Sequence, residues 1–109
     1  MVKENMVIYV DFDETIARTS IDRDYASSEP ILENIDMINT LYDKGHTIIY
    51  WTARGTLKKD NYFKVTLNQL DKWGCKYHEL RMGKPYYDLF IDDKNLNVKD
   101  LHNYINRSL

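Results

Sequence analysis

The sequence predicts an α/β protein: a three-layer sandwich with a Rossmann-like, mostly parallel sheet and no cap or second domain. Short continuous apolar runs, typical of strands buried on both faces, alternate with segments of helical periodicity. The resulting order is strand, helix, strand, helix, two strands and a helix, which favours parallel pairing. The length of 109 residues corresponds to one domain, residues 1–109, with a core of modest size.

The first half of the chain supplies two strands and a helix. Met6 to Val10 is the first expected strand, and Thr15 to Glu29 is polar and irregular. Pro30 opens the first expected helix, because proline is favoured in the first helical turn. Lys44-Gly45 closes that helix. Thr47 to Trp51 is the second expected strand.

The second half continues the alternation. The second helix is expected over Tyr62 to Trp73, with Gly74 as its stop. A short strand is expected over Tyr77 to Met82 and a further apolar strand over Asp88 to Ile91. The last helix is expected over Val98 to Ile105, because its apolar residues recur at helical spacing.

Composition and charge exclude several classes of protein. The formal net charge is −2 and the sequence pI is about 5.9, so neither nucleic acid nor a membrane is an expected partner. No apolar run is long enough to span a membrane, and the N-terminal run is too short for a signal peptide. The single Cys75 excludes an intrachain disulfide. We therefore expect a cytoplasmic protein.

Polar residues follow three of the expected strands. Asp11, Thr52 and Asp92 each lie at the carboxyl end of a strand, and ligands of such sheets bind at that edge. Asp13 and Asp93 bring further carboxylates to the same place. Carboxylates this close repel one another or hold protons unless a cation joins them. Mg²⁺ is a hard ion that takes oxygen ligands, so it would remove the repulsion.

Cationic and hydroxyl groups accompany these acids. Gly83-Lys84-Pro85 places an amine on a rigid loop, and Thr52 offers a hydroxyl. Arg54 precedes a helix whose N-terminus can face an anion. Carboxylates, a divalent cation, an amine and a hydroxyl around one phosphate make a phosphoryl-transfer site.

The order of these motifs resembles that of the haloacid dehalogenase-like (HAD) superfamily. The first motif is Asp11-Phe12-Asp13-Glu14-Thr15, and the second is Thr52 after an apolar strand. The third is Lys84 and the fourth is Asp92-Asp93, so the resemblance covers nearly the whole chain. It implies an HAD-like fold and a phosphatase that forms an aspartyl-phosphate.

The resemblance implies roles for individual residues. Asp11 is the implied nucleophile, and Asp13 is the implied general acid and base. Thr52 and Lys84 complete the implied catalytic set. The residues expected to bind substrate are Thr52, Ala53, Arg54 and Lys84.

Magnesium is the implied cofactor. Its expected ligands are Asp11, Asp13 through the backbone carbonyl, Asp92 and Asp93. Asp93 can instead orient Lys84, and the sequence does not separate the two roles. Glu14 is expected to be a solvated or structural acid. An acid at position 13 favours a phosphatase over the ATPases of the superfamily.

No segment is long enough for the cap domain that many relatives carry over the site. Arg18 to Glu29, about a dozen residues, is a flap and not a domain. Capless relatives either act on large substrates or form oligomers in which a neighbouring subunit covers the open site. A homo-oligomer is therefore one expected arrangement.

Several functions remain open at this point. The capless length, Tyr25 followed by Pro30, and the segments Thr52 to Gly55, Gly83 to Pro85 and Ile91 to Lys94 resemble the small phosphatases associated with capsular-polysaccharide biosynthesis. This resemblance implies a sugar phosphate or another small phosphate ester as substrate. The letters Asp11 to Thr15 also resemble protein phosphatases of the transcription-tail type. A polynucleotide phosphatase and a non-catalytic phosphate-binding module are further alternatives.

Overall fold

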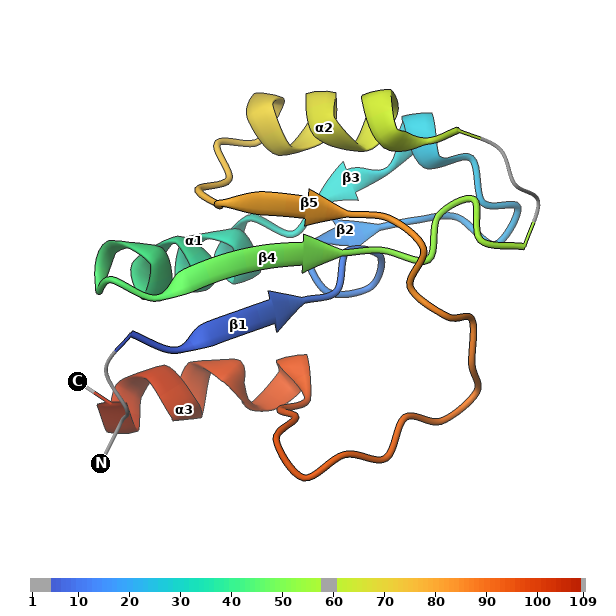
Figure 1. Ribbon diagram of the computed structural model, residues 1–109. Helices are drawn as coiled ribbons and strands as arrows, with labels where there is room; N and C mark the ends of the chain where they lie inside the picture. The colour runs from blue at the N-terminus through green and yellow to red at the C-terminus, as the bar shows by residue number, and fades with distance from the viewer. Residues whose placement is uncertain (1–4, 58–60, 109) are drawn as a thin grey trace.

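The structure is a computed structural model that describes residues 5–57 and 61–108. Within these residues the main sheet has three parallel strands in the order β1-β4-β5 (Figure 1). They are β1 (Val7–Val10), β4 (Thr47–Trp51) and β5 (Glu79–Arg81). The α/β class and the parallel sheet are confirmed. Because the strands are parallel, their carboxyl ends meet at one edge.

In the part of the chain that the structure describes, three α-helices connect or follow the strands. α1 (Leu32–Asp43) precedes β4, and α2 (Phe63–Lys72) lies between β4 and β5. α3 (Leu101–Ser108) follows the short 3₁₀ turn η2 (Val98–Asp100). These bounds lie within a few residues of the expected ones, because the apolar spacing that predicts each helix is also the face that it buries.

The polar segment between the first strand and the first helix forms a small flap. β2 (Ala17–Arg18) pairs antiparallel with β3 (Glu29–Pro30), and the 3₁₀ turn η1 (Tyr25–Ser27) lies between them. The Ile31 backbone N–H donates to the Ile16 carbonyl at 2.8 Å, which ties the base of the flap to the start of α1.

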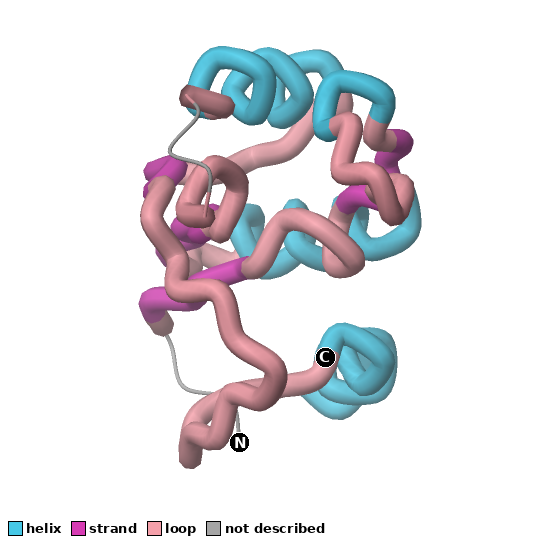
Figure 2. Tube along the Cα trace, turned by 90° about the vertical axis from the view of Figure 1, so that its right-hand side faces the viewer, coloured by secondary structure: helices cyan, strands magenta, loops and turns pink. Residues whose placement is uncertain are grey.

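The core lies on one face of the sheet. Val10 and Ile48 are buried against the helices, whereas Val7 and Tyr9 on the opposite face are 62% and 48% exposed. The helices contribute to the same cluster the buried residues Ile35, Ile38, Leu41, Leu70, Leu101 and Ile105. In Figure 2 the strands of the main sheet lie at the left, with helices above them and to their right. Within the described residues the helices thus form a layer on this face of the sheet, while the other face carries exposed side chains.

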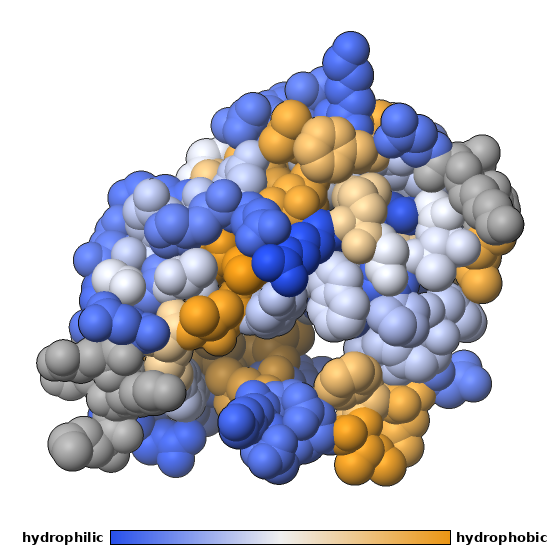
Figure 3. Space-filling view, in the orientation of Figure 1, coloured by the Kyte–Doolittle hydropathy of each residue, from blue (hydrophilic) through white to orange (hydrophobic). Residues whose placement is uncertain are grey.

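The expected strand over Asp88 to Ile91 is wrong. These residues belong to the segment 82–97, which swings out beyond the strand ends before it reaches α3 (Figure 1). Leu89 and Ile91 are 75% and 87% exposed, and Figure 3 shows apolar atoms on the lower right of the molecule, where this segment passes. A strand forms only when a neighbour supplies the hydrogen-bond ladder, and within the described residues β1 pairs with β4 on one side only.

Two identical truncations, one of a buried and one of an exposed leucine, should lower the free energy of unfolding by different amounts. Leu70 has no exposed surface, so Leu70→Ala should lower the free energy of unfolding by about 2–5 kcal/mol through lost burial and a cavity. Leu89→Ala is the matched control and should cost less than about 0.5 kcal/mol. Urea denaturation of both variants measures the difference. Equal losses would contradict the placement of one of the two side chains.

Cys75 packs against the core, and burial raises the pKa of its thiol to about 11. The thiolate is the reactive form. We therefore expect iodoacetamide to alkylate Cys75 about 100-fold more slowly at pH 8 than an ordinary thiol, with the rate rising as pH approaches 11. The same reaction in denaturant supplies the control, because unfolding restores an ordinary thiol. Equal rates in the folded and unfolded protein would contradict the burial of Cys75.

Among the described helices, none combines the length and the apolar character that crossing a membrane requires.

Candidate active site

Backbone hydrogen bonds join the carboxyl ends of β4 and β5. The Thr52 N–H donates to the Arg81 carbonyl at 3.0 Å, and the Lys84 N–H donates to the Thr52 carbonyl at 3.0 Å. Gly83 lies between them with φ +80°, a conformation that side chains other than glycine rarely adopt. The turn at Gly83 thus brings Lys84 back to the end of β4, beside β1.

Lys84 and Asp11 form an ion pair at this edge of the sheet. The Nζ atom of Lys84 lies 3.3 Å from Oδ1 of Asp11, and the two side chains are 12% and 41% exposed. Burial raises the pKa of the Asp11 carboxyl, and the Lys84 ammonium opposes part of that rise. Asp11 therefore combines a partly desolvated carboxylate with one exposed side, which is the arrangement that a nucleophile needs.

Aromatic rings surround the Lys84 ammonium. Its Nζ atom lies 5.3 Å from the ring centre of Tyr87 and 6.0 Å from that of Trp51. Cations are attracted to the faces of such rings. The rings and Asp11 together restrict the positions that the ammonium can occupy, so its charge is held next to Asp11.

A tight turn after β1 places Asp13 on the flap side of the same edge. The Phe12 carbonyl accepts hydrogen bonds from the N–H groups of Thr15, Ile16 and Ala17. Glu14 adopts φ +64°, a left-handed conformation that costs a non-glycine residue about 1 kcal/mol. Its carboxylate is exposed and pairs with Arg23 at 2.7 Å, as expected for a solvated acid.

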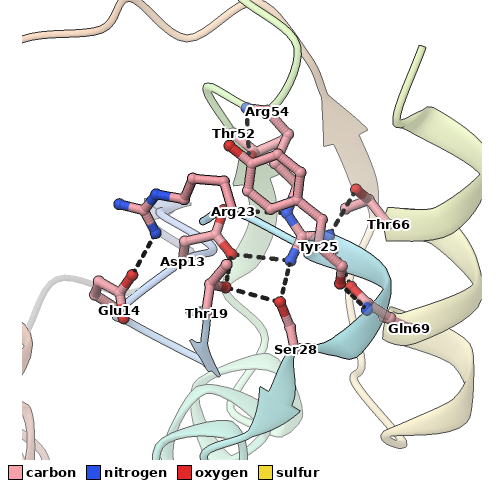
Figure 4. A network of polar contacts seen from close by, with 10 residues as sticks. All are labelled: Asp13, Glu14, Thr19, Arg23, Tyr25, Ser28, Thr52, Arg54, Thr66 and Gln69. Carbon is pink, nitrogen blue, oxygen red and sulfur yellow. Dashed lines mark hydrogen bonds and ion pairs between the residues drawn. The ribbon is translucent and has the colours of Figure 1, made fainter. Parts of the chain in front are cut away.

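Arg54 binds the Asp13 carboxylate through two hydrogen bonds from one edge of its guanidinium (Figure 4). The Nε atom of Arg54 donates to Oδ2 of Asp13 at 3.0 Å, and Nη2 donates to Oδ1 at 2.9 Å. The Arg54 side chain has no exposed surface, and the Asp13 side chain is 16% exposed. This forked pair has the geometry of a strong arginine–carboxylate interaction.

Thr52 is buried at the end of β4. Its hydroxyl oxygen accepts a hydrogen bond from the Arg54 backbone N–H at 3.2 Å and keeps its own proton for donation. Ala53 is half-buried, and its carbonyl accepts a hydrogen bond from the Thr56 N–H at 3.0 Å. The segment from Thr52 to Thr56 is therefore a turn anchored at both ends.

The structure does not bring Asp92 and Asp93 to Asp11 and Asp13. Both lie exposed on the segment 82–97, where the Asp93 N–H donates to Oδ1 of Asp92 at 2.7 Å. Within residues 5–57 and 61–108, no three side chains of His, Cys, Asp or Glu lie close enough to hold a metal ion. The donor set implied for Mg²⁺ is not assembled in this arrangement.

A small pocket lies beside the anchored turn. It has a volume of about 190 Å³, and its lining includes Gly55, Thr56, Tyr62 and Met82. Its position next to Gly83 places it close to Lys84 along the chain. A larger hollow of about 570 Å³ lies along α3, away from these residues.

Sequence reasoning missed the polar residues that surround Asp13 and Arg54. Thr19 donates to Asp13, and the other members of the network are Ser28, Thr66 and Gln69. Each is an ordinary polar residue in a flap or on a helix, and its role depends on contacts with distant parts of the chain. Nothing in the local sequence distinguishes them from solvated residues.

No protein-family model matches this chain, and no curated protein sequence matches it. Its structure is similar to the crystal structure of a structural-genomics target from Vibrio cholerae. The two chains are 23% identical, with a TM-score of 0.74, and the match covers 95% of this chain and 99% of the other. At this identity the likeness shows the α/β fold.

Proposed function

We propose that the protein is a phosphatase of the HAD superfamily that hydrolyses small phosphate monoesters through an aspartyl-phosphate. The observation that carries the proposal is the contact between Lys84 and Asp11 at the carboxyl ends of the parallel strands. An aspartate that is partly desolvated, opposed by a fixed ammonium and open on one side fits a nucleophile for phosphorus. The proposal also rests on the motif order in the sequence.

The proposed reaction has two steps. A carboxylate oxygen of Asp11 attacks phosphorus, the bond to the leaving oxygen breaks, and Asp13 supplies the proton that the leaving group takes. Water then attacks the phosphorus of the aspartyl-phosphate and Asp13 accepts a proton from it. The bond between phosphorus and the Asp11 oxygen breaks, which frees inorganic phosphate and restores the Asp11 carboxylate. Lys84 offsets the negative charge gathered at Asp11, and the Thr52 hydroxyl is a donor for the phosphoryl oxygens.

The proposal includes dependence on Mg²⁺ because the sequence motifs resemble those of a magnesium-dependent superfamily. The described arrangement keeps Asp92 and Asp93 on an exposed segment, so the residues as placed do not form an oxygen cage for the ion. Mg²⁺ titration of activity tests this part of the proposal separately.

The proposed substrate is small, such as the sugar phosphates of polysaccharide biosynthesis. A pocket of about 190 Å³ beside the Thr52–Thr56 turn is suited to a leaving group of modest size. The described flap is short, and its residues Thr19 and Ser28 contact Asp13 and Arg54. A neighbouring subunit is the proposed means of covering the open site. A cytoplasmic location completes the proposal.

The direct test uses p-nitrophenyl phosphate with the purified protein and Mg²⁺. We expect release of p-nitrophenolate, inhibition by a chelator and recovery after Mg²⁺ is returned. A second assay with sugar phosphates, nucleotides, 3′-phosphorylated oligonucleotides and phosphopeptides ranks the substrate classes by kcat/KM. Highest activity on phosphopeptides or oligonucleotides would overturn the small-molecule assignment while keeping the phosphatase.

A phosphate-binding module is the second candidate. The exposed positions of Asp92 and Asp93 favour it, because a site without its metal ligands can bind an anion and leave it intact. Calorimetry with inorganic phosphate distinguishes the two. Binding without turnover of any ester in the panel, with or without Mg²⁺, would favour the module.

A further inference from the structure

We propose that Arg54 is a positioning residue that sets the orientation of the Asp13 carboxylate by locking it to the flap and to α2. This inference rests on the proposed function, in which Asp13 transfers the proton. It assigns Arg54 a different part from the substrate contact that the sequence pattern predicts.

All five N–H groups of the Arg54 guanidinium have partners within the protein. Two donate to Asp13, as described above, and Nη2 also donates to the Ser28 hydroxyl at 3.3 Å. Nη1 donates to the Thr66 hydroxyl at 3.1 Å and to the Gln69 amide oxygen at 2.7 Å. A guanidinium has five such donors, so in this arrangement none is left for a phosphate.

Burial makes this pairing necessary. The Arg54 side chain has no exposed surface, and a buried charge is destabilising by several kcal/mol unless it is fully paired. The guanidinium carbon lies 4.2 Å from the ring centre of Phe12 and 4.7 Å from that of Tyr25, so two aromatic rings also contact the buried charge.

The network joins three segments that are distant in the sequence (Figure 4). Arg54 follows β4, Ser28 and Tyr25 belong to the flap, and Gln69 lies on α2. Gln69 also donates from Nε2 to the Tyr25 carbonyl at 2.7 Å, so the flap is bonded to α2 directly as well as through Arg54. The flap is therefore held in place by α2 through Arg54, without a cap domain.

The consequence falls on Asp13. The fork from Nε and Nη2 engages both carboxylate oxygens, and the Thr19 hydroxyl donates a further hydrogen bond to Oδ1. Oδ1 thus accepts two hydrogen bonds and Oδ2 one, which leaves Oδ2 with more acceptor capacity for a group in the site. A carboxylate that is misplaced by about 1 Å can lose 100-fold in rate, so this fork is expected to act on kcat.

The test compares Arg54→Ala and Arg54→Lys with Arg107→Met, an exposed arginine on α3 that serves as the control. We expect kcat for p-nitrophenyl phosphate to fall about 10- to 100-fold in both Arg54 variants with KM little changed. Arg54→Lys keeps the charge and most of the stem, so it remains informative if Arg54→Ala fails to fold. Guanidinium, added far below unfolding concentrations, should restore part of the rate to Arg54→Ala and none to Arg54→Lys.

A direct role in substrate binding would give the opposite result. KM for the substrate would rise in both Arg54 variants, kcat would be kept, and affinity for inorganic phosphate would fall. Those changes would overturn the proposal, and so would a lack of any rescue of a folded Arg54→Ala variant by guanidinium.

Crystal structures of the wild type and of Arg54→Lys provide a readout that needs no activity. The Asp13 carboxylate should leave its position when the fork is lost, and an unchanged rotamer would overturn the positioning role. An inactive wild-type protein would defeat the proposed phosphatase, yet the crystal comparison would still decide what Arg54 does to Asp13.

Discussion

Asp11→Asn is expected to abolish phosphatase turnover while the fold survives. The amide has nearly the shape of the carboxylate, but it cannot attack phosphorus, so no aspartyl-phosphate forms. We expect the rate with p-nitrophenyl phosphate to fall by about 1,000-fold or more, as for other enzymes that lose their nucleophile. Circular dichroism and urea denaturation of the same sample check that the protein is still folded.

Asp36→Asn is the matched control, because Asp36 is an exposed aspartate on α1. It should retain the wild-type rate. Near-normal turnover of Asp11→Asn would mean that Asp11 is not the nucleophile, and the proposed reaction would then have no covalent step.

Asp11→Asn should also stabilise the metal-free protein at neutral pH. Because burial raises the pKa of Asp11, the folded state holds its proton more strongly than the unfolded state does. Stability therefore falls as pH rises from the ordinary aspartate pKa through the raised one. Asp11→Asn removes this loss, so it should unfold at higher urea than wild type at pH 7 in chelator. The difference should vanish at a pH below the ordinary pKa.

Asp13→Asn is expected to give the second largest loss of activity. Removal of a general acid and base lowers rates by about 10²- to 10⁴-fold. p-Nitrophenolate leaves without a proton, so Asp11 should still become phosphorylated while the hydrolysis that needs Asp13 is slow. Mass spectrometry of acid-quenched protein should then find the mass of one added phosphoryl group.

Glu14→Gln supplies the control for this experiment. Glu14 is adjacent in the chain, but its carboxylate is exposed and pairs with Arg23. It should turn over at the wild-type rate without accumulating phosphoprotein. If Asp13→Asn retains the wild-type rate and carries no phosphoryl group, Asp13 is not the general acid and base. Arg54 would then have no effect on the rate through the position of Asp13.

Local sequence patterns were sufficient for part of the candidate site. Asp11 and Thr52 follow apolar runs, and such runs become parallel strands whose carboxyl ends share an edge. Lys84 follows a glycine that makes a turn, and the structure places its ammonium 3.3 Å from Asp11. Period and turn chemistry are short-range properties, so they can be read from a few adjacent residues.

The strand expected over Asp88 to Ile91 shows that local patterns do not determine strand pairing. Its apolar run has the composition of a strand, but strand formation depends on a partner, and no local signal states whether the edge of β1 is paired. The positions of Asp92 and Asp93 depend on the same pairing, because these residues directly follow that run in the chain.

The sequence by itself determined the α/β class, the order of the main-sheet strands and helices, and the places of Asp11 and Thr52 at strand ends, because these follow from apolar periodicity and from the turns that end each element. Only the tertiary structure decided that the core occupies one face of the sheet and that Arg54 is buried against Asp13. The reason is physical: the burial of an arginine depends on partners from separate segments, here the flap and α2. Their meeting is a property of packing, which no local stretch of sequence contains.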